Sequence, residues 1–184
     1  MEIEKTPLEG CFIIKPRVFM DERGSFFESF NQEKFEKLTG KTVRFVQNNQ
    51  SISSRGVLRG LHFQKGKFAQ AKLVRVISGE VLDVAVDLRR DSKTFGEHFS
   101  IVLNETNNYQ LFVPRGFAHG FSTLSERAIF SYQCDNFYHQ ESESGVLYKD
   151  PQLSIDWKLK DSEVLLSQKD KVLPLLGDFT ENYM

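Results

Sequence analysis

Two of the four histidines stand in surroundings that suit acid–base chemistry. His62 follows Arg59 within one apolar run, and His119 lies between Phe117 and Phe121 in a second. Imidazole titrates near neutral pH and can exchange a proton there, whereas guanidinium is a permanent cation that suits phosphate groups. The first segment therefore brings a candidate base and a candidate anion anchor together.

The spacing of Arg59 and His62 conflicts with a regular strand. Side chains alternate along a strand, so residues three apart face opposite sides. Gly60 lies between the two, and a glycine inside a strand often marks a bulge that redirects a side chain. We predict a bulge here, with Arg59 and His62 turned toward a shared ligand; an unbroken strand would contradict this.

Three further polar clusters are less specific, at residues 21–28, 46–51 and 166–171. Each fits an ordinary polar turn or loop. Consecutive amides such as those at 47–50 are also good donors and acceptors for a base or a sugar. The sequence pattern alone leaves both interpretations open.

We expect neither a metal nor a cofactor. His62 is followed two residues later by Gln64, whereas the site of a metal-dependent dioxygenase typically has a His-x-His pair. His62 and His119 alone supply too few ligands for a metal site. A metal-dependent oxygenase is the first alternative. Elemental analysis of the purified protein tests it by showing whether a metal is present.

The bulk composition fits one domain spanning residues 1–184. The chain is 40% hydrophobic and long enough to bury a core. A formal net charge of −1 gives no field for a nucleic acid, and no apolar run is long enough to cross a membrane. Cys11 and Cys134 suggest no disulfide framework, and the first residues do not resemble a signal peptide, so we expect a cytoplasmic protein.

Short extended runs separated by turn residues predict an all-β fold. The clearest run is 81–88, whose strict alternation is typical of a half-buried strand. Residues 78–80, with Gly79 at their centre, predict a hairpin turn into that strand. The other expected strands cover residues 11–15, 26–30, 43–49, 57–64, 71–77, 98–103, 109–113, 120–124 and 128–134.

Helix is expected at two places. Asn31 is a candidate N-cap and Gly40 a candidate stop, which predicts a helix over residues 31–40. A second short helical piece is expected near residues 161–166. Residues 177–184 carry no pattern and are expected to be loosely held.

Seven segments together closely resemble the dTDP-4-dehydrorhamnose 3,5-epimerase family of cupin-like barrels. Two are GVLRGLHFQ at residues 56–64 and PRGFAHGF at residues 114–121; the others lie at 18–28, 45–51, 72–76, 83–89 and 166–170, all in the family's order. The resemblance implies a cupin-like double-stranded β-helix, or jelly-roll barrel, with a few short helices. It also implies a homodimer with strand exchange.

The resemblance implies roles for individual side chains. His62 resembles the general base, with Asp170 as its carboxylate partner. Tyr132 resembles the acid on the opposite face of the sugar, and Lys72 the cation beside the ketone oxygen. Tyr138 resembles the ring that stacks on thymine. The implied substrate-binding residues are Arg23, Phe26, Glu28, Gln47, Asn49, Arg59, His119, Tyr138, Glu143 and Lys169.

The implied substrate is dTDP-4-dehydro-6-deoxy-D-glucose, in which C3 and C5 flank a C4 ketone. Removing a proton from either carbon leaves an enolate, so the reaction needs a base of near-neutral pKa and a cation at the oxygen. His62 with Asp170 meets the first need and Lys72 the second. Inversion needs a proton from the other face, which the Tyr132 hydroxyl can supply.

Two further alternatives remain open. A relative that epimerises only C3, or that moves the keto group, would use the same acid–base pair. A non-catalytic sugar-nucleotide sensor would use the same barrel, but a pure binder needs no opposed acid and base. Without the resemblance, Tyr132 would be an ordinary strand tyrosine and Lys72 a surface lysine.

Overall fold

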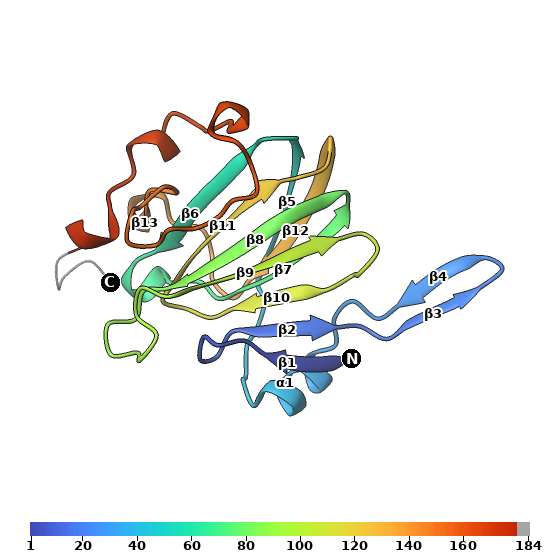
Figure 1. Ribbon diagram of the computed structural model, residues 1–184. Helices are drawn as coiled ribbons and strands as arrows, with labels where there is room; N and C mark the ends of the chain where they lie inside the picture. Colours follow the sequence, from blue (N-terminus) through green and yellow to red (C-terminus); the bar gives the residue numbers. More distant parts are fainter. Residues whose placement is uncertain (180–184) are drawn as a thin grey trace.

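Two antiparallel β-sheets packed face to face dominate the computed structural model, which describes residues 1–179 (Figure 1). The all-β class predicted from the sequence is confirmed. The six-stranded sheet has the order β1 (Glu2–Lys5), β2 (Phe12–Lys15), β10 (Gln110–Val113), β7 (Lys72–Ser78), β12 (Arg127–Cys134) and β5 (Gln47–Ser54). The five-stranded sheet has the order β13 (Glu143–Gly145), β6 (Leu58–Gln64), β11 (Phe117–Thr123), β8 (Glu80–Asp87) and β9 (His98–Asn104).

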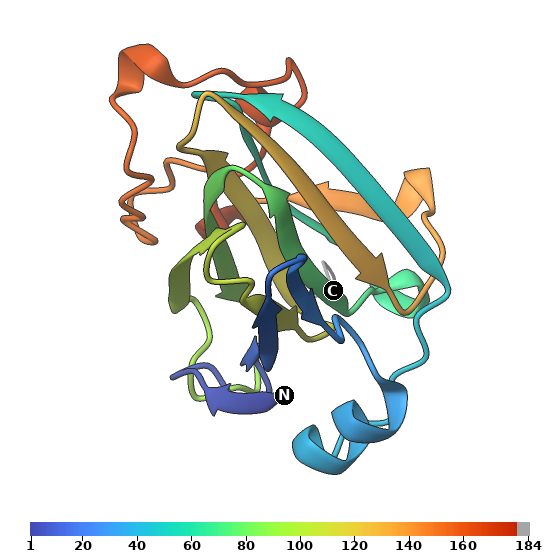
Figure 2. The same ribbon diagram turned by 90° about the vertical axis from the view of Figure 1, so that its right-hand side faces the viewer.

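The remaining elements are short. β3 (Val18–Asp21) and β4 (Gly24–Phe27) form a separate two-stranded sheet, here called the arm, which extends beyond the two main sheets (Figure 1). Helix α1 (Gln32–Thr39) lies at the lower end of both views, away from most of the orange-to-red C-terminal segment (Figures 1 and 2). The described chain also has 3₁₀ turns at Gly66–Phe68, Gln140–Ser142, Asp161–Glu163, Asp170–Val172 and Leu176–Asp178.

Apolar side chains pack in three clusters. The first lies between the sheets and includes Val74 and Phe130 from the six-stranded sheet and Ala85 from the five-stranded sheet. The second covers the outer face of the five-stranded sheet, where the C-terminal segment contributes Trp157. The third covers part of the outer face of the six-stranded sheet, where Phe35 of α1 is completely buried. Each sheet therefore has apolar side chains packed against both of its faces.

The third cluster explains two misplaced strand predictions. The strands predicted at residues 26–30 and 43–49 are shorter or shifted, because β4 ends at Phe27 and β5 begins at Gln47. The apolar residues between them and the helix, Phe30 and Phe45, pack around Phe35 instead. Strands β1, β3 and β13 were not predicted.

Strand β8 alternates as predicted but is buried on both faces, so the half-buried prediction is wrong. Ala85 contributes to the cluster between the sheets, while Val84 contributes to the outer cluster. Asp83 and Asp87 are also buried. The alternation distinguishes the two faces of β8. Both faces are buried, because the C-terminal segment packs on the outer face of the five-stranded sheet.

The turn at residues 78–80 is not a hairpin. Strand β7 belongs to the six-stranded sheet and β8 to the five-stranded sheet, so the turn carries the chain from one sheet to the other. Gly79 has φ +82°, and a Cβ at this position would lie 2.1 Å from the backbone oxygen of Arg127. The glycine was correctly placed, but the strand pairing it implied was wrong.

Helix α1 follows its prediction closely. The Asn31 side chain accepts a hydrogen bond from the Lys34 N–H at 3.0 Å, and Gly40 ends the helix with φ +67°. The second expected helical piece is a single 3₁₀ turn at Asp161–Glu163. Residues 180–184 of the tail lie outside the described residues. No helix within residues 1–179 is long and apolar enough to cross a membrane.

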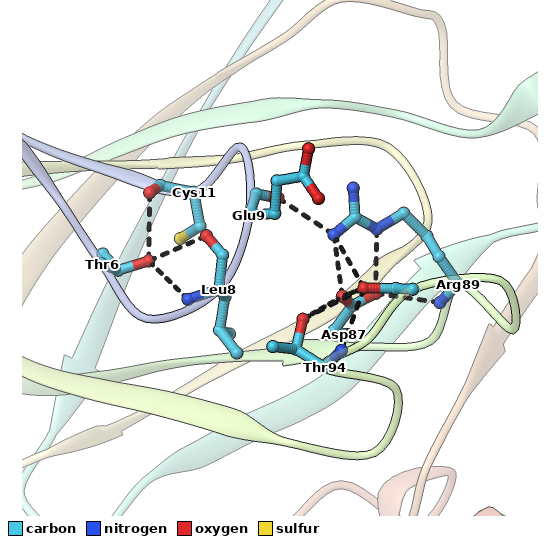
Figure 3. Close-up of polar contacts among 8 residues, drawn as sticks. Thr6, Leu8, Glu9, Cys11, Asp87, Arg89 and Thr94 are labelled. Carbon is cyan, nitrogen blue, oxygen red and sulfur yellow. Dashed lines mark hydrogen bonds and ion pairs between the residues drawn. The ribbon is translucent and has the colours of Figure 1, made fainter.

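A buried carboxylate ties the N-terminal segment to the five-stranded sheet (Figure 3). Asp87 accepts hydrogen bonds from the Arg89 Nε and Nη2 atoms at 2.9 and 2.7 Å, and from the Ser92 and Thr94 hydroxyls at 2.6 and 2.7 Å. Arg89 also donates to the Glu9 carbonyl at 2.9 Å. Burial raises the pKa of Asp87, but these donors lower it by more, so the group is ionised in a fully satisfied site.

Candidate active site

Strand β6 contains the predicted bulge. His62 lies opposite His119 on β11, and Arg59 lies opposite Phe121, so three steps on β6 match two on β11. Leu58 and Leu61 both pack in the second cluster, on the outer face of the five-stranded sheet, although they are three residues apart. The alternation therefore slips by one residue, and Arg59 and His62 line the same pocket.

Two glycines make the bulge sterically feasible. A Cβ on Gly60, whose φ is +134°, would lie 2.6 Å from the Gly120 Cα atom. A Cβ on Gly120 would lie 2.7 Å from the Arg59 carbonyl oxygen. Because both neighbours are backbone atoms, the two strands approach this closely only where neither residue has a side chain.

A pocket of about 510 Å³ opens between the two sheets beside this bulge. It draws side chains from both sheets and from the C-terminal segment. Seven residues singled out from the sequence line it: Arg59, His62, Lys72, His119, Tyr132, Lys169 and Asp170. The remaining lining residues are Ser51, Val57, Leu58, Phe121, Phe130, Leu165, Leu166 and Ser167.

On one side of the pocket, His62 and Asp170 form a close pair. The Nε2 atom of His62 lies 2.6 Å from Oδ1 of Asp170, and the carboxylate side chain is only 4% exposed. Burial raises the pKa of Asp170, but the hydrogen bond from His62, the charge of His62 when it is protonated, and the Ser167 hydroxyl lower it by more. Donation from Nε2 to an ionised carboxylate leaves the ring's lone pair on Nδ1.

The segment that carries Asp170 is attached to the start of β6 by backbone pairing. Leu165 forms an isolated parallel bridge with Val57. Its N–H donates to the Gly56 carbonyl at 2.8 Å, and its carbonyl accepts from the Leu58 N–H at 3.0 Å. These bonds hold an otherwise irregular segment against β6, which brings residue 170 beside residue 62.

Tyr132 and Lys72 reach the pocket from the opposite, six-stranded sheet. Tyr132 lies on β12, between Val74 of β7 and Asn49 of β5. The ammonium nitrogen of Lys72 is 5.9 Å from the centroid of the Tyr132 ring. Burial raises the pKa of the Tyr132 hydroxyl and lowers the pKa of Lys72. The pocket therefore holds an imidazole on one wall and a protonated phenol on the other.

A second histidine–carboxylate pair lies deeper in the barrel. The Nε2 atom of His119 is 2.9 Å from Oδ1 of Asp83, and both side chains are buried. The other oxygen of Asp83 is buried and has no hydrogen-bond partner among the described residues. The charge of Asp83 also opposes the effect of burial on the pKa of Lys72. The charge of Asp83 thus favours the cationic form of Lys72.

A chain of hydrogen bonds borders the pocket near Lys169. The Lys169 ammonium lies 2.5 Å from the Glu143 carboxylate, which accepts from the Tyr138 hydroxyl at 2.9 Å. The Tyr138 N–H donates to Gln47 at 2.9 Å, and Gln47 donates to Asn49 at 3.0 Å. Burial raises the pKa of Glu143, but the bonds from Lys169 and Tyr138 lower it by more. All four remaining expected residues of this region are therefore connected.

Comparison with known proteins agrees with this geometry. Residues 5–178 match the family model described as dTDP-4-dehydrorhamnose 3,5-epimerase. The chain belongs to this family. An Escherichia coli K12 member is 50% identical over 178 residues, which cover 97% of this chain and 96% of that protein.

Two solved structures of dTDP-sugar 3,5-epimerases superpose closely. The Elizabethkingia anophelis enzyme has a TM-score of 0.95 and 57% identity, covering 100% of this chain and 99% of that one. The Legionella pneumophila enzyme, solved in complex with dTDP-4-keto-L-rhamnose, has a TM-score of 0.95 and 48% identity, covering 100% and 96%. The sandwich of this epimerase-family chain is therefore cupin-like, as predicted.

Three expected binding residues of the epimerase family do not reach the pocket of their own chain. Arg23, Phe26 and Glu28 lie on or just after the arm, and none lines the pocket. The Arg23 side chain is 86% exposed and pairs with Asp21, while Glu28 pairs with Lys34. Phe26 is 71% exposed. Within one chain, these three residues contribute nothing to the site.

Sequence reasoning assigned no role to Asp83, which the structure places against His119. The available signal was an aspartate on the inward side of an apolar strand, since a buried charge needs a partner. Among the described residues, no group of three or more His, Cys, Asp or Glu side chains is arranged to hold a metal ion.

Proposed function

We propose that the chain converts dTDP-4-dehydro-6-deoxy-D-glucose to dTDP-4-dehydro-L-rhamnose by epimerisation at C3 and C5, without a metal or cofactor. The observation that carries this proposal is the pair of opposed groups, His62 on β6 and Tyr132 on β12, which line one pocket. The Legionella relative, solved with the corresponding keto sugar, supports the same substrate class.

Proton removal is the task of His62. Its Nδ1 atom takes the proton from the carbon beside the C4 ketone, and the imidazolium that forms is stabilised by Asp170 at 2.6 Å. Negative charge then develops on the ketone oxygen. Lys72 stabilises that enolate, because a cation held in a partly buried site acts in a low dielectric.

Proton return is the task of Tyr132. Burial raises the pKa of its hydroxyl, so the phenol stays protonated at neutral pH and can donate. Because it comes from the sheet opposite His62, its proton reaches the other face of the sugar ring, which inverts the carbon. The pocket residues Arg59, His119 and Lys169 provide positive charge and donors for the diphosphate and sugar.

The nucleotide occupies the border of the pocket in this proposal. The ring of Tyr138, which is 54% exposed, stacks on the thymine. Gln47, Asn49 and Glu143, which form the hydrogen-bond chain with Tyr138, contact the nucleotide or the sugar.

The site is completed by a second copy of the chain in the same proposal. The arm exposes Phe19, Met20 and Phe26, and a two-stranded sheet of this kind is marginally stable on its own in water. In a homodimer with strand exchange, the arm covers its apolar side on the partner. Arg23, Phe26 and Glu28 then reach the partner's pocket.

Mixing two inactive variants tests the shared site. His62→Asn removes the base and leaves the arm intact, whereas Arg23→Ala alters the arm and leaves the pocket intact. Subunits unfolded and refolded together form half mixed dimers, each with one intact site, so about a quarter of wild-type activity returns. No recovery in dimers that demonstrably mix means that each site uses its own arm.

The reaction is tested by incubating the keto sugar with the wild-type protein in heavy water and following C3 and C5 by NMR. Deuterium at both carbons with inversion supports the proposal. Label at C3 alone identifies a 3-epimerase, and a shifted ketone identifies a ketoisomerase. Binding without label at either carbon leaves a non-catalytic sensor.

The proposal also includes one domain acting in the cytoplasm. Both cysteines, Cys11 and Cys134, are buried free thiols, which suits a reducing compartment. Burial raises their pKa values to about 12 and about 11, so neither is a reactive thiolate at neutral pH.

A further inference from the structure

The side chain of Gln64, the last residue of β6, makes three hydrogen bonds, one to Phe68 and two to the segment at residues 137–139. Its side-chain amide nitrogen donates to the carbonyls of Phe68 and Phe137, at 2.8 and 3.1 Å. Its amide oxygen accepts from the His139 N–H at 2.6 Å. The residue is only 7% exposed, so water does not compete with these bonds.

The bonds of Gln64 hold the two residues that flank Tyr138. The Gln64 amide nitrogen donates to the carbonyl of Phe137, and its amide oxygen accepts from the N–H of His139. The backbone at position 138 is therefore held from both sides. The His139 ring also stacks on Phe68, with centroids 3.7 Å apart and planes 7° apart. Tyr138 is itself 54% exposed, so packing of its own ring does not fix its position.

We propose that Gln64 is a positioning residue for nucleotide binding, acting through Tyr138. Gln64 links β6, which carries His62, to the loop that carries Tyr138. It thereby fixes the position of the Tyr138 ring before the nucleotide binds. Preorganisation of this kind improves affinity because the ordering cost is already met in the free protein. The inference rests on the proposed stacking role of Tyr138.

Only a glutamine-like amide satisfies this site. Two carbonyl oxygens face its nitrogen and one N–H faces its oxygen, which requires a donor and an acceptor on one planar group. Gln64→Glu keeps the shape but places an acceptor against the carbonyls of Phe68 and Phe137. Gln64→Met removes all three bonds at similar volume.

The experiment measures dTDP affinity by calorimetry and steady-state kinetics with the keto sugar. For Gln64→Glu and Gln64→Met we expect the Kd for dTDP and the KM to rise about tenfold, consistent with the loss of several neutral hydrogen bonds. The value of kcat should stay within about threefold, because His62 and its carboxylate partner are untouched. A fall in kcat with unchanged Kd would overturn the proposal.

A double-mutant cycle distinguishes positioning from general destabilisation. If Gln64 acts through the ring, Gln64→Glu should weaken dTDP binding in the wild type but not in a Tyr138→Ala background. Additive losses in the two backgrounds would overturn the proposal. An unchanged Kd for Tyr138→Ala alone would instead refute the stacking role, which keeps the two failures distinguishable.

A matched control is Ser122→Ala. Ser122 is also buried on the five-stranded sheet and donates to a loop carbonyl, that of Trp157, at 2.8 Å, but it does not line the pocket. It should lower the melting temperature without changing dTDP affinity. If Gln64→Met does not fold, Gln64→Asn, which keeps both polar groups on a shorter side chain, carries the same test. Parallel losses of affinity in Ser122→Ala and the Gln64 variants would overturn the proposal.

Discussion

Replacing Asp170 by Asn should reduce turnover by about three orders of magnitude while leaving the fold intact. The carboxylate lies 2.6 Å from the His62 Nε2 atom, and the two side chains are 4% and 26% exposed. With charge centres about 4 Å apart and an effective dielectric constant of about 20, the attraction to the imidazolium is about 4 kcal/mol. A transition-state loss of that size corresponds to about 10³-fold in kcat.

The assay compares kcat for deuterium incorporation from heavy water in the wild type and in Asp170→Asn. Binding of dTDP should be unchanged within about twofold, because the amide keeps the shape of the carboxylate. Asp156→Asn is the control, since it removes an exposed carboxylate that pairs only with Lys158 among the described residues. A kcat for Asp170→Asn within tenfold of wild type would refute the reasoning.

Two further predictions concern the scaffold. Asp87→Asn should lower the free energy of unfolding by about 3 kcal/mol at pH 7, because it leaves Arg89 without its buried partner. Since the folded pKa of Asp87 lies below its unfolded value, this contribution is complete above about pH 4 and is lost as the pH falls through the folded pKa; urea titrations that show a pH-independent difference would contradict it. Gly120→Ala should cost about 1–3 kcal/mol and disturb the pocket, because the new Cβ meets the Arg59 carbonyl. The same titration with Gly177→Ala, where the nearest atom is 3.4 Å away, should show little change, and equal effects in the two variants would argue against the close approach.

Local patterns predicted those features that local geometry controls. The conflict between strand period and the spacing of Arg59 and His62 correctly indicated the bulge, because alternation is a property of the backbone itself. Asn31 and Gly40 correctly bounded α1 for the same reason. The turn at Gly79 was wrong in its consequence, because which strands pair depends on the whole sandwich rather than on the turn residues.

The site could not be assembled from spacing alone. Tyr132, Lys72 and Asp170 come from two strands and an irregular segment, and only the packing of the sheets brings them to one pocket with His62. Their selection depended on the family resemblance, because each is unremarkable in its own segment. Asp83 was missed because its partner lies on a neighbouring strand, which no sequence period predicts.

The most direct test of the opposed acid and base is incubation of the unlabelled keto sugar with Tyr132→Phe in heavy water. His62 remains partly exposed in that variant, so a proton it takes can exchange with solvent and return to the same face of the sugar. We predict deuterium at the reacting carbons with the original configuration retained and inversion reduced by about 10²-fold or more. Inverted product formed at the wild-type rate would contradict the account.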